Sequence, residues 1–179
     1  MLTSNWKKLI RGGLTYTISC NDVPRAMKTI TLNNTGGTAF NFTHGSMSSY
    51  EDDWTNCVTL GHFGTYYTGS SSSDYYTVFG NGSTPPTEDD IWLSGDRITN
   101  IGVSSVVSST INDDGSVCKT AVFTISNKST TDDITISEVG TCDYITSYVL
   151  LDRTLLDEPV TIPAGGVGQI TYTINFNIA

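Results

Sequence analysis

The sequence has few charged residues, and basic residues are especially scarce. Only 15% of its 179 residues are charged, and nine lysines and arginines against 18 acids give a net charge of −9. Direct binding of nucleic acid needs clustered basic side chains to neutralise phosphates. The closest grouping here is Lys7, Lys8 and Arg11. The composition therefore predicts no direct contact with nucleic acid.

Long apolar runs are also missing. No stretch approaches the roughly 20 apolar residues of a membrane-spanning helix. The segment Met1–Arg11 lacks the apolar core and the small-residue cleavage site of a signal peptide. We therefore expect neither insertion into a membrane nor secretion through such a signal.

Motifs for catalysis or metal binding are likewise absent from the sequence pattern. The sequence has four cysteines and two histidines. No two of the cysteines (Cys20, Cys57, Cys118 and Cys142) form a Cys-x-x-Cys pair, so neither histidine has a cysteine pair near it. We expect free thiols in a reducing cytoplasm, although four cysteines also allow three disulfide connectivities. No nucleophile elbow, phosphate-binding glycine loop or histidine pair occurs. The sequence predicts a protein that is not an enzyme and that holds no metal or cofactor.

Four pairs of neighbouring aspartates are the main alternative to this interpretation: Asp52–Asp53, Asp89–Asp90, Asp113–Asp114 and Asp132–Asp133. Neighbouring carboxylates can act in glycoside hydrolysis or bind calcium. No pair has the alternating ligand spacing of a calcium loop, and each falls at an expected turn or strand entrance. Aspartate caps backbone amides at such positions, so we interpret the pairs as turn residues.

Threonine, serine, asparagine and glycine fill much of the remaining chain, and apolar residues recur at every second position. This alternation is clearest over Leu14–Cys20 and Gln169–Ile178. A period of two is typical of half-buried strands. Strands separated by short turns predict an all-β fold, an antiparallel β-sandwich of the jelly-roll or immunoglobulin-like kind. We assign it to residues 14–179, with a soft subdivision near residue 95.

Further strands and turns follow from the same pattern. We expect strands over residues 27–32, 91–93, 98–111, 117–126, 134–139, 148–151, 160–162 and 169–178, and turns over 33–37, 112–115, 127–133 and 165–168. Glycines and prolines between Val78 and Asp90 predict an irregular loop there.

The first 13 residues differ from this pattern and predict a short helix over Ser4–Gly13. Trp6, Leu9 and Ile10 have the spacing of one helical face. One interpretation is a helix that covers an end of the β core. The other is a docking segment that inserts Trp6 into a neighbouring subunit.

Aromatic residues surround a serine run, Ser70–Ser73, that we expect to be the tip of a hairpin. Tyr66 and Tyr67 precede this run, and Tyr75 and Tyr76 follow it. Cross-strand aromatic pairs would stabilise such a hairpin. The alternative is a ligand platform of these tyrosines together with Trp54, which would bind a sugar or a protein.

Arg153 stands out as a basic residue between acids and leucines, in the run Leu150–Asp157. It could form an ion pair inside the chain, which contributes little if exposed. It could instead clamp a neighbouring subunit. The sequence leaves both interpretations open.

Four stretches resemble small virion structural proteins of tailed bacteriophages from gut bacteria. They are Met1–Ile10 (MLTSNWKKLI), Val78–Gly95 (VFGNGSTPPTEDDIWLSG), Ile134–Gly140 (ITISEVG) and Leu150–Gly166 (LLDRTLLDEPVTIPAGG). The resemblance implies a component of the tail, the collar or the capsid surface, such as a decoration or head-fibre protein, and brings no catalytic motif.

The partners expected of such a component are other virion proteins and further copies of the chain in a symmetric homo-oligomer. The expected location is the virion, assembled in the host bacterial cytoplasm. The alternative function is a receptor- or carbohydrate-binding module at a fibre or tail tip, which would bind a host surface glycan or receptor.

Overall fold

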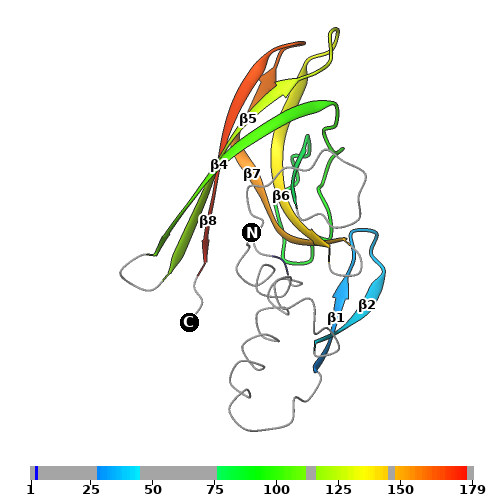
Figure 1. Ribbon diagram of the computed structural model, residues 1–179. Coiled ribbons are helices and arrows are strands. Elements are labelled where there is room, and N and C mark those ends of the chain that lie inside the picture. Colours follow the sequence, from blue (N-terminus) through cyan, green and yellow to red (C-terminus); the bar gives the residue numbers. More distant parts are fainter. Residues whose placement is uncertain (1–2, 4–27, 45–75, 112–115, 145–147, 177–179) are drawn as a thin grey trace.

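The computed structural model describes residue 3 and residues 28–44, 76–111, 116–144 and 148–176 (Figure 1). All the regular structure in these residues is β, which confirms the predicted class, and they include no helix. The strands are β1 (Lys28–Asn33), β2 (Ala39–His44), β3 (Tyr76–Gly80), β4 (Ile101–Ile111), β5 (Val117–Asn127), β6 (Ile134–Tyr144), β7 (Tyr148–Ile162) and β8 (Val167–Phe176). The helix expected over Ser4–Gly13 lies outside the described residues.

The longer strands form two antiparallel three-stranded sheets, with the orders β3-β6-β7 and β4-β5-β8. A separate antiparallel pair is formed by β1 and β2. Each three-stranded sheet contains one hairpin, β6–β7 or β4–β5. The chain passes from one sheet to the other three times, between β3 and β4, between β5 and β6, and between β7 and β8 (Figure 1).

Asn127 joins the last two of these crossings, β5 to β6 and β7 to β8. Its side-chain amide donates to the carbonyl oxygens of Asp132 at 2.8 Å, in the β5 to β6 crossing, and of Pro163 at 3.1 Å, in the β7 to β8 crossing. Its backbone N–H donates to the carbonyl of Gly166 at 2.9 Å. Because one buried side chain satisfies carbonyls of both crossings, the two connections lie at the same end of the sheets.

The main hydrophobic core contains buried residues of both sheets. Phe79 of β3 and Phe123 of β5 meet in an edge-to-face arrangement, with ring centroids 5.2 Å apart and planes at 87°, a favoured geometry for aromatic pairs. The buried members of this cluster are Phe79, Ile101, Ala121, Phe123, Ile125, Ile136, Val139, Val149, Leu151, Ile162, Ile170, Tyr172 and Ile174. The alternation predicted for the last strand is thus confirmed at Ile170, Tyr172 and Ile174.

A second apolar cluster covers the opposite face of the β3-β6-β7 sheet. Val78, Cys142 and Leu150 of the sheet are buried together with Leu93, and Trp92 packs against them. The sheet is therefore covered on both faces, by the other sheet and by the segment between β3 and β4.

Three sequence expectations about strand limits were wrong. The short strands expected at 148–151 and 160–162 are the two ends of β7, which continues through Asp152 and Arg153. Residues 78–80 belong to β3 instead of the expected loop, and Ile91–Leu93 forms no strand. In two of these cases tertiary packing decides, because Arg153 forms a buried ion pair with Glu138 of β6 and Leu93 is buried as part of a loop.

Two predicted turns are confirmed, and each uses a glycine with positive φ. Gly37 (φ 79°) follows Asn34, whose side-chain oxygen accepts the N–H groups of Gly36 at 3.0 Å and Thr38 at 2.8 Å. Gly165 (φ 67°) lies in a turn closed by a 2.8 Å hydrogen bond from the Gly166 N–H to the Pro163 carbonyl. Such backbone conformations favour glycine over other residues.

Candidate functional site

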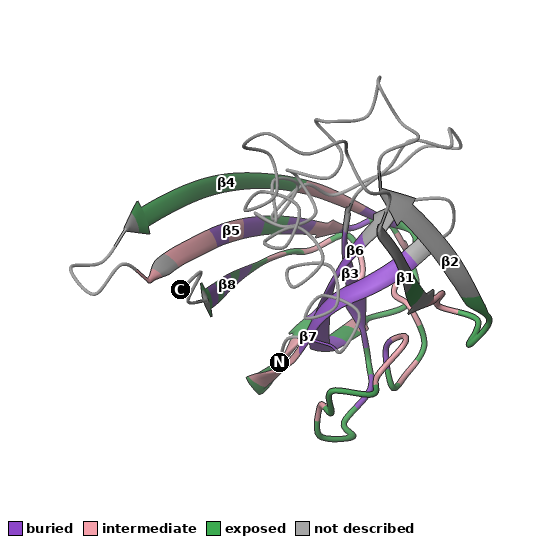
Figure 2. Ribbon diagram, turned by 90° about the horizontal axis from the view of Figure 1, so that it is seen from below, coloured by how far each residue is buried: buried purple, intermediate pink, exposed green. Residues whose placement is uncertain are grey.

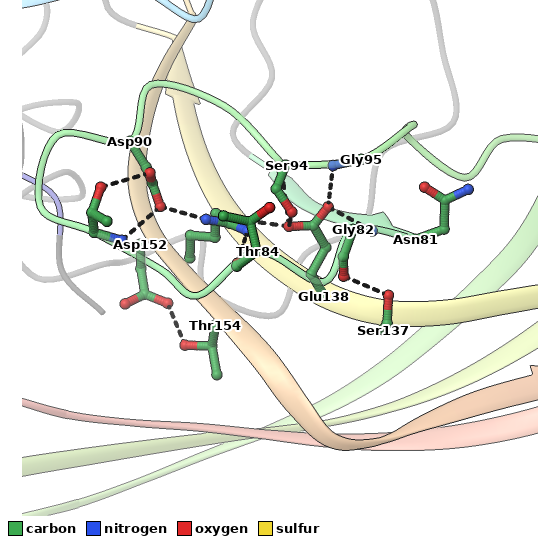
Figure 3. Close-up of polar contacts among 12 residues, drawn as sticks. Asn81, Gly82, Thr84, Asp90, Ser94, Gly95, Ser137, Glu138, Asp152 and Thr154 are labelled. Atoms are coloured by element: carbon green, nitrogen blue, oxygen red, sulfur yellow. Dashed lines mark hydrogen bonds and ion pairs between the residues drawn. The ribbon is translucent and has the colours of Figure 1, made fainter.

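The segment 81–97, between β3 and β4, has irregular structure, yet a buried carboxylate anchors it to the sheet (Figure 3). The side chain of Glu138 on β6 is 0% exposed. Its Oε1 accepts the N–H groups of Gly82 at 3.0 Å and Gly95 at 2.8 Å. Its Oε2 accepts the N–H of Ser94 at 3.0 Å and the Ser94 hydroxyl at 3.1 Å. One carboxylate therefore binds both ends of the segment.

Arg153, the neighbour of Glu138 on β7, holds the middle of the same segment. Its Nε lies 2.7 Å from Glu138 Oε2, and its NH1 group lies 2.5 Å from Asp90 Oδ2. Its NH2 group donates to the Thr84 carbonyl at 2.6 Å. The Arg153 side chain is 1% exposed. All three nitrogens of this buried guanidinium bind acceptors within the chain.

Gly82 and Gly95 allow the two ends of the segment to lie against each other. A Cβ atom on Gly82 would lie 2.4 Å from the backbone nitrogen of Gly95, and a Cβ on Gly95 would lie 2.4 Å from that of Gly82. Side chains larger than hydrogen do not fit at such distances. The Ser137 hydroxyl donates to the Gly82 carbonyl at 2.7 Å and fixes this approach from the sheet.

The ionisation of this group of residues is mutually supported. Burial disfavours the charged form of Glu138, but hydrogen bonds from the Ser94 and Gly95 amides and from Arg153 outweigh it, and the pKa of Glu138 is lowered. Burial also acts against ionised Asp90, yet hydrogen bonds from Thr87 and Arg153 lower the pKa of this carboxyl. The two carboxylates in turn raise the pKa of Arg153 against the effect of burial. The residues therefore form a charged network at neutral pH.

Two of the aspartate pairs, Asp89–Asp90 and Asp132–Asp133, lie in the described residues and take part in turn and loop contacts, as expected. Asp90 accepts the Thr87 N–H at 2.9 Å and the Thr87 hydroxyl at 2.8 Å. Asp133 accepts the N–H of Ala164 at 3.0 Å. In the described part of the chain, no group of three His, Cys, Asp or Glu side chains could hold a metal ion. The pairs Asp52–Asp53 and Asp113–Asp114 lie outside that part.

A second buried carboxylate, Asp152, lies next to Arg153 on β7 but faces the main core. Tyr172 of β8, in the other sheet, donates its hydroxyl to Asp152 Oδ2, and the Thr154 hydroxyl lies 3.4 Å from the same oxygen. Burial raises the pKa of Asp152. Asp152 thus forms a polar contact between the two sheets.

The structure resolves one of the two interpretations of Arg153. The ion pair within the chain is present, and it is buried, not exposed. A contact between Arg153 and a neighbouring subunit stays a prediction. With the guanidinium 1% exposed, such a contact would involve the surface of the segment that Arg153 supports.

The other candidate residues lie in parts of the chain that the structure does not describe. These are Trp6, Leu9 and Ile10 of the docking segment and Trp54, Tyr66, Tyr67 and Tyr75 of the ligand platform. Tyr76 is the first residue of β3, with its side chain outside the described part. From the first 13 residues the structure describes Thr3, whose N–H donates to the Leu151 carbonyl at 2.9 Å. The docking segment and the platform therefore stay predictions.

Sequence reasoning missed Glu138, Gly82 and Gly95. One signal was present: Glu138 is a single acid in the apolar strand Ile134–Gly140, where an unpaired charge would be costly. Pairing this acid with Arg153, the nearest basic residue to follow it in the second half of the chain, would have indicated a buried ion pair. Cys118 and Cys142 form no disulfide with a described residue, in line with the expected thiols, whereas Cys20 and Cys57 lie outside the described residues.

Comparisons with protein-family models, with curated proteins and with solved structures found no match to this chain. No helix within the described residues is long and apolar enough to cross a membrane.

Proposed function

We propose that the chain is a non-enzymatic structural protein of a bacteriophage virion. It acts through protein–protein contacts as a tail or collar component, a capsid decoration or a head-fibre protein. Its site of action is the virion, after assembly in the host bacterial cytoplasm. The two sheets belong to a β-sandwich of the jelly-roll or immunoglobulin-like kind, and the partners are other virion proteins and further copies of the chain.

The observation that carries this proposal is the anchoring of segment 81–97. The tip of this segment, residues 83–85 and 87–89, is exposed. Glu138 and Arg153, on the sheet, hold the backbone of the segment by hydrogen bonds. Loops held on a rigid scaffold are suited to recognition, because little conformational entropy is lost when they bind. Residues 81–95 of this segment also belong to one of the stretches that resemble virion proteins. We therefore assign the partner contact to its tip.

The test is whether the chain is present in phage particles and whether this tip attaches it. Particles produced by a host that carries the gene are purified, and the chain is quantified by mass spectrometry and located by immunogold labelling. We expect a fixed number of copies per particle at one position. A chain that is confined to the soluble lysate, with particles free of it, would overturn the proposal.

Paired charge reversals locate the contact. Asp89→Arg changes the exposed tip, and Asp157→Arg makes the same charge change at an exposed position of β7. We expect Asp89→Arg to lower incorporation into particles at least tenfold and Asp157→Arg to leave it unchanged. Equal incorporation of both variants would show that the tip is not the contact. Binding of host glycans by a folded sample on an array would instead support the receptor-binding alternative.

A further inference from the structure

Strand β4 is an edge of the β4-β5-β8 sheet and is exposed along most of its length (Figure 2). Among the described residues it pairs with β5 alone. Every residue from Ser104 to Thr110 is exposed, which includes side chains on both faces of the strand. Two of them are valines, Val106 at 74% and Val107 at 44% exposure. Strand β4 therefore offers backbone groups that no other described strand pairs, together with apolar side chains.

The outer edge of the other sheet differs from β4 in each respect. Strand β7 is irregular between Leu155 and Val160, where the register with β6 shifts. Asp157, Glu158 and Pro159 are exposed at this irregularity. Thr3 additionally binds the β7 backbone at Leu151. Charges, proline, bulges and coverage are the features by which proteins prevent strand addition at an edge.

Strand β4 has none of these protective features in its sequence. Ile101–Ile111 (IGVSSVVSSTI) contains no charged residue and no proline. In a chain with a net charge of −9, an uncharged edge is where two copies repel each other least. The central run, Ser104–Ser109 (SSVVSS), consists of small hydroxyl and β-branched side chains. An antiparallel copy centred on this run would therefore place only such side chains opposite one another.

We propose that β4 pairs antiparallel with β4 of a second copy of this chain around a twofold axis. The result is a continuous six-stranded sheet in the order β8-β5-β4-β4-β5-β8. A twofold axis perpendicular to the sheet keeps the core faces of both copies on one side, so residues directly opposite must belong to the same face. The axis therefore passes through Val106 or through Val107, and the residue on the axis lies opposite the same residue of the other copy.

The other edge of this sheet, β8, is less suited to such pairing. Its core-facing side chains Ile170, Tyr172 and Ile174 are already buried within the chain. Strand addition there would cover little further apolar surface, apart from Val167 at the start of the strand, which is 65% exposed. Val167 thus provides a matched control for Val106.

The inference deepens the proposed function by naming the surface of self-assembly, and it rests on that function for the expectation that copies associate. Molar mass is measured by light scattering at about 1 μM to about 1 mM, a range suited to small interfaces. We expect a dimer that dissociates on dilution. Val106→Lys should weaken it at least tenfold, since the lysine of each copy would lie at the twofold axis or next to it, while Val167→Lys should leave it unchanged. Both positions are exposed, so equal melting temperatures will show that the variants fold.

Cross-linking through introduced cysteines tests the register directly. Opposite residues of an antiparallel pair have Cα atoms about 4.5 to 5.5 Å apart, within the range that a disulfide spans. We expect Val106→Cys or Val107→Cys, but not both equally, to form a disulfide-linked dimer under mild oxidation. Val167→Cys and the unchanged chain, with its native thiols, are the controls.

The outcomes separate this inference from the proposed function. A monomer at every concentration, a dimer that Val106→Lys leaves intact, or equal effects of the lysine variants would each overturn β4 pairing. Particles that contain the chain would still support the virion role in those cases. Conversely, a β4 dimer with no chain in the particles would support the interface and contradict the virion role.

Discussion

Glu138 and Asp152 are both buried carboxylates of the β3-β6-β7 sheet, yet burial has opposite consequences for them. They are 0% and 2% exposed, respectively. Glu138 lies under the segment 81–97, whereas Asp152 faces the core between the sheets. The pKa of Glu138 is lowered, and that of Asp152 is raised by burial. Depth alone therefore does not determine whether a carboxyl group is charged.

The difference lies in the balance between burial and the groups around each carboxylate. Glu138 accepts hydrogen bonds from three backbone amides, a hydroxyl and the Arg153 guanidinium, and together these donors outweigh burial. At Asp152, which the hydroxyls of Tyr172 and Thr154 contact, burial outweighs the groups that favour the charged form. Several fixed amides and a cation that act together stabilise an ionised carboxylate strongly. The Glu138 side of the sheet thus holds a charge network, and the Asp152 side holds a polar contact in an apolar core.

The largest loss of stability is expected when the positive charge of Arg153 is removed. Arg153→Met keeps the apolar stem but leaves Glu138 buried with no positive partner, and we expect a loss of about 3 to 5 kcal/mol of stability. The measurement is the free energy of unfolding in urea. The double variant Arg153→Met/Glu138→Gln should recover part of the loss, because it also removes the buried charge. A loss below about 1 kcal/mol in the single variant would contradict a structural role of the pair.

The second largest effect is expected in the pH dependence of stability, which should reveal that Glu138 and Asp90 are ionised in the folded chain. Because the pKa values of Glu138 and Asp90 are lowered in the folded chain, their contribution is complete above the unfolded values of about 4. It is lost as the pH falls through the lower folded values. Unfolding free energies between pH 7 and pH 2 measure this loss. Glu138→Gln should flatten the acid side of the curve, and an unchanged slope would show that Glu138 is not ionised in the folded state.

On the core side of the sheet, removing polarity should stabilise the protein. Thr77 and Thr141 are paired directly across β3 and β6, and both are buried with hydroxyl groups that find no hydrogen-bond partner in the described part of the chain. Replacing both by valine keeps the shape and removes the desolvation cost. We expect a gain of about 1 to 2 kcal/mol in unfolding free energy. Thr135→Val/Thr161→Val is the control, because those exposed hydroxyls bind each other at 3.0 Å. A loss of stability in the first variant would show that the buried hydroxyls are satisfied.

The smallest effect is expected at Asp152. Its raised pKa means that the charged form is disfavoured in the fold, so its contribution to stability increases as the pH falls through the folded pKa. Asp152→Asn keeps an acceptor for the Tyr172 hydroxyl without the charge. We expect equal stability or a gain of up to about 1 kcal/mol at pH 7, with a flatter curve above pH 4. Thermal melts against the exposed control Asp157→Asn measure the change, and a clear loss at pH 7 would mean that ionised Asp152 is stabilised.

The sequence predicted strands best where one face is buried and the other exposed. In β8, Ile170, Tyr172 and Ile174 alternate with exposed polar residues, and the period of two was sufficient. The period of two failed to predict β7 as one strand, because charged residues such as Asp152 and Arg153 indicate a break in a strand unless their buried partners are known. It failed again at Leu93, a buried apolar residue outside any strand. Local pattern does not distinguish burial by a sheet from burial by a loop.

The candidate site was predictable only in part, because its contacts are distant in sequence. The turn role of Asp90 follows from its neighbour Thr87 three residues away. The pairing of Arg153 with Asp90 spans 63 residues, and that of Glu138 with Gly82 spans 56. Such contacts depend on which strands lie side by side. A lone acid in an apolar strand indicates a buried partner but does not identify it.

The anchoring of segment 81–97 also has a consequence for amide hydrogen exchange. The N–H groups of Gly82, Ser94 and Gly95 donate to one buried side chain. Their protons can therefore exchange with solvent only when Glu138 separates from the segment or the sheet itself opens. We expect these three amides, in a stretch without regular structure, to exchange as slowly as those of β6. The irregular segment would then unfold together with the strands beneath it, as one cooperative unit.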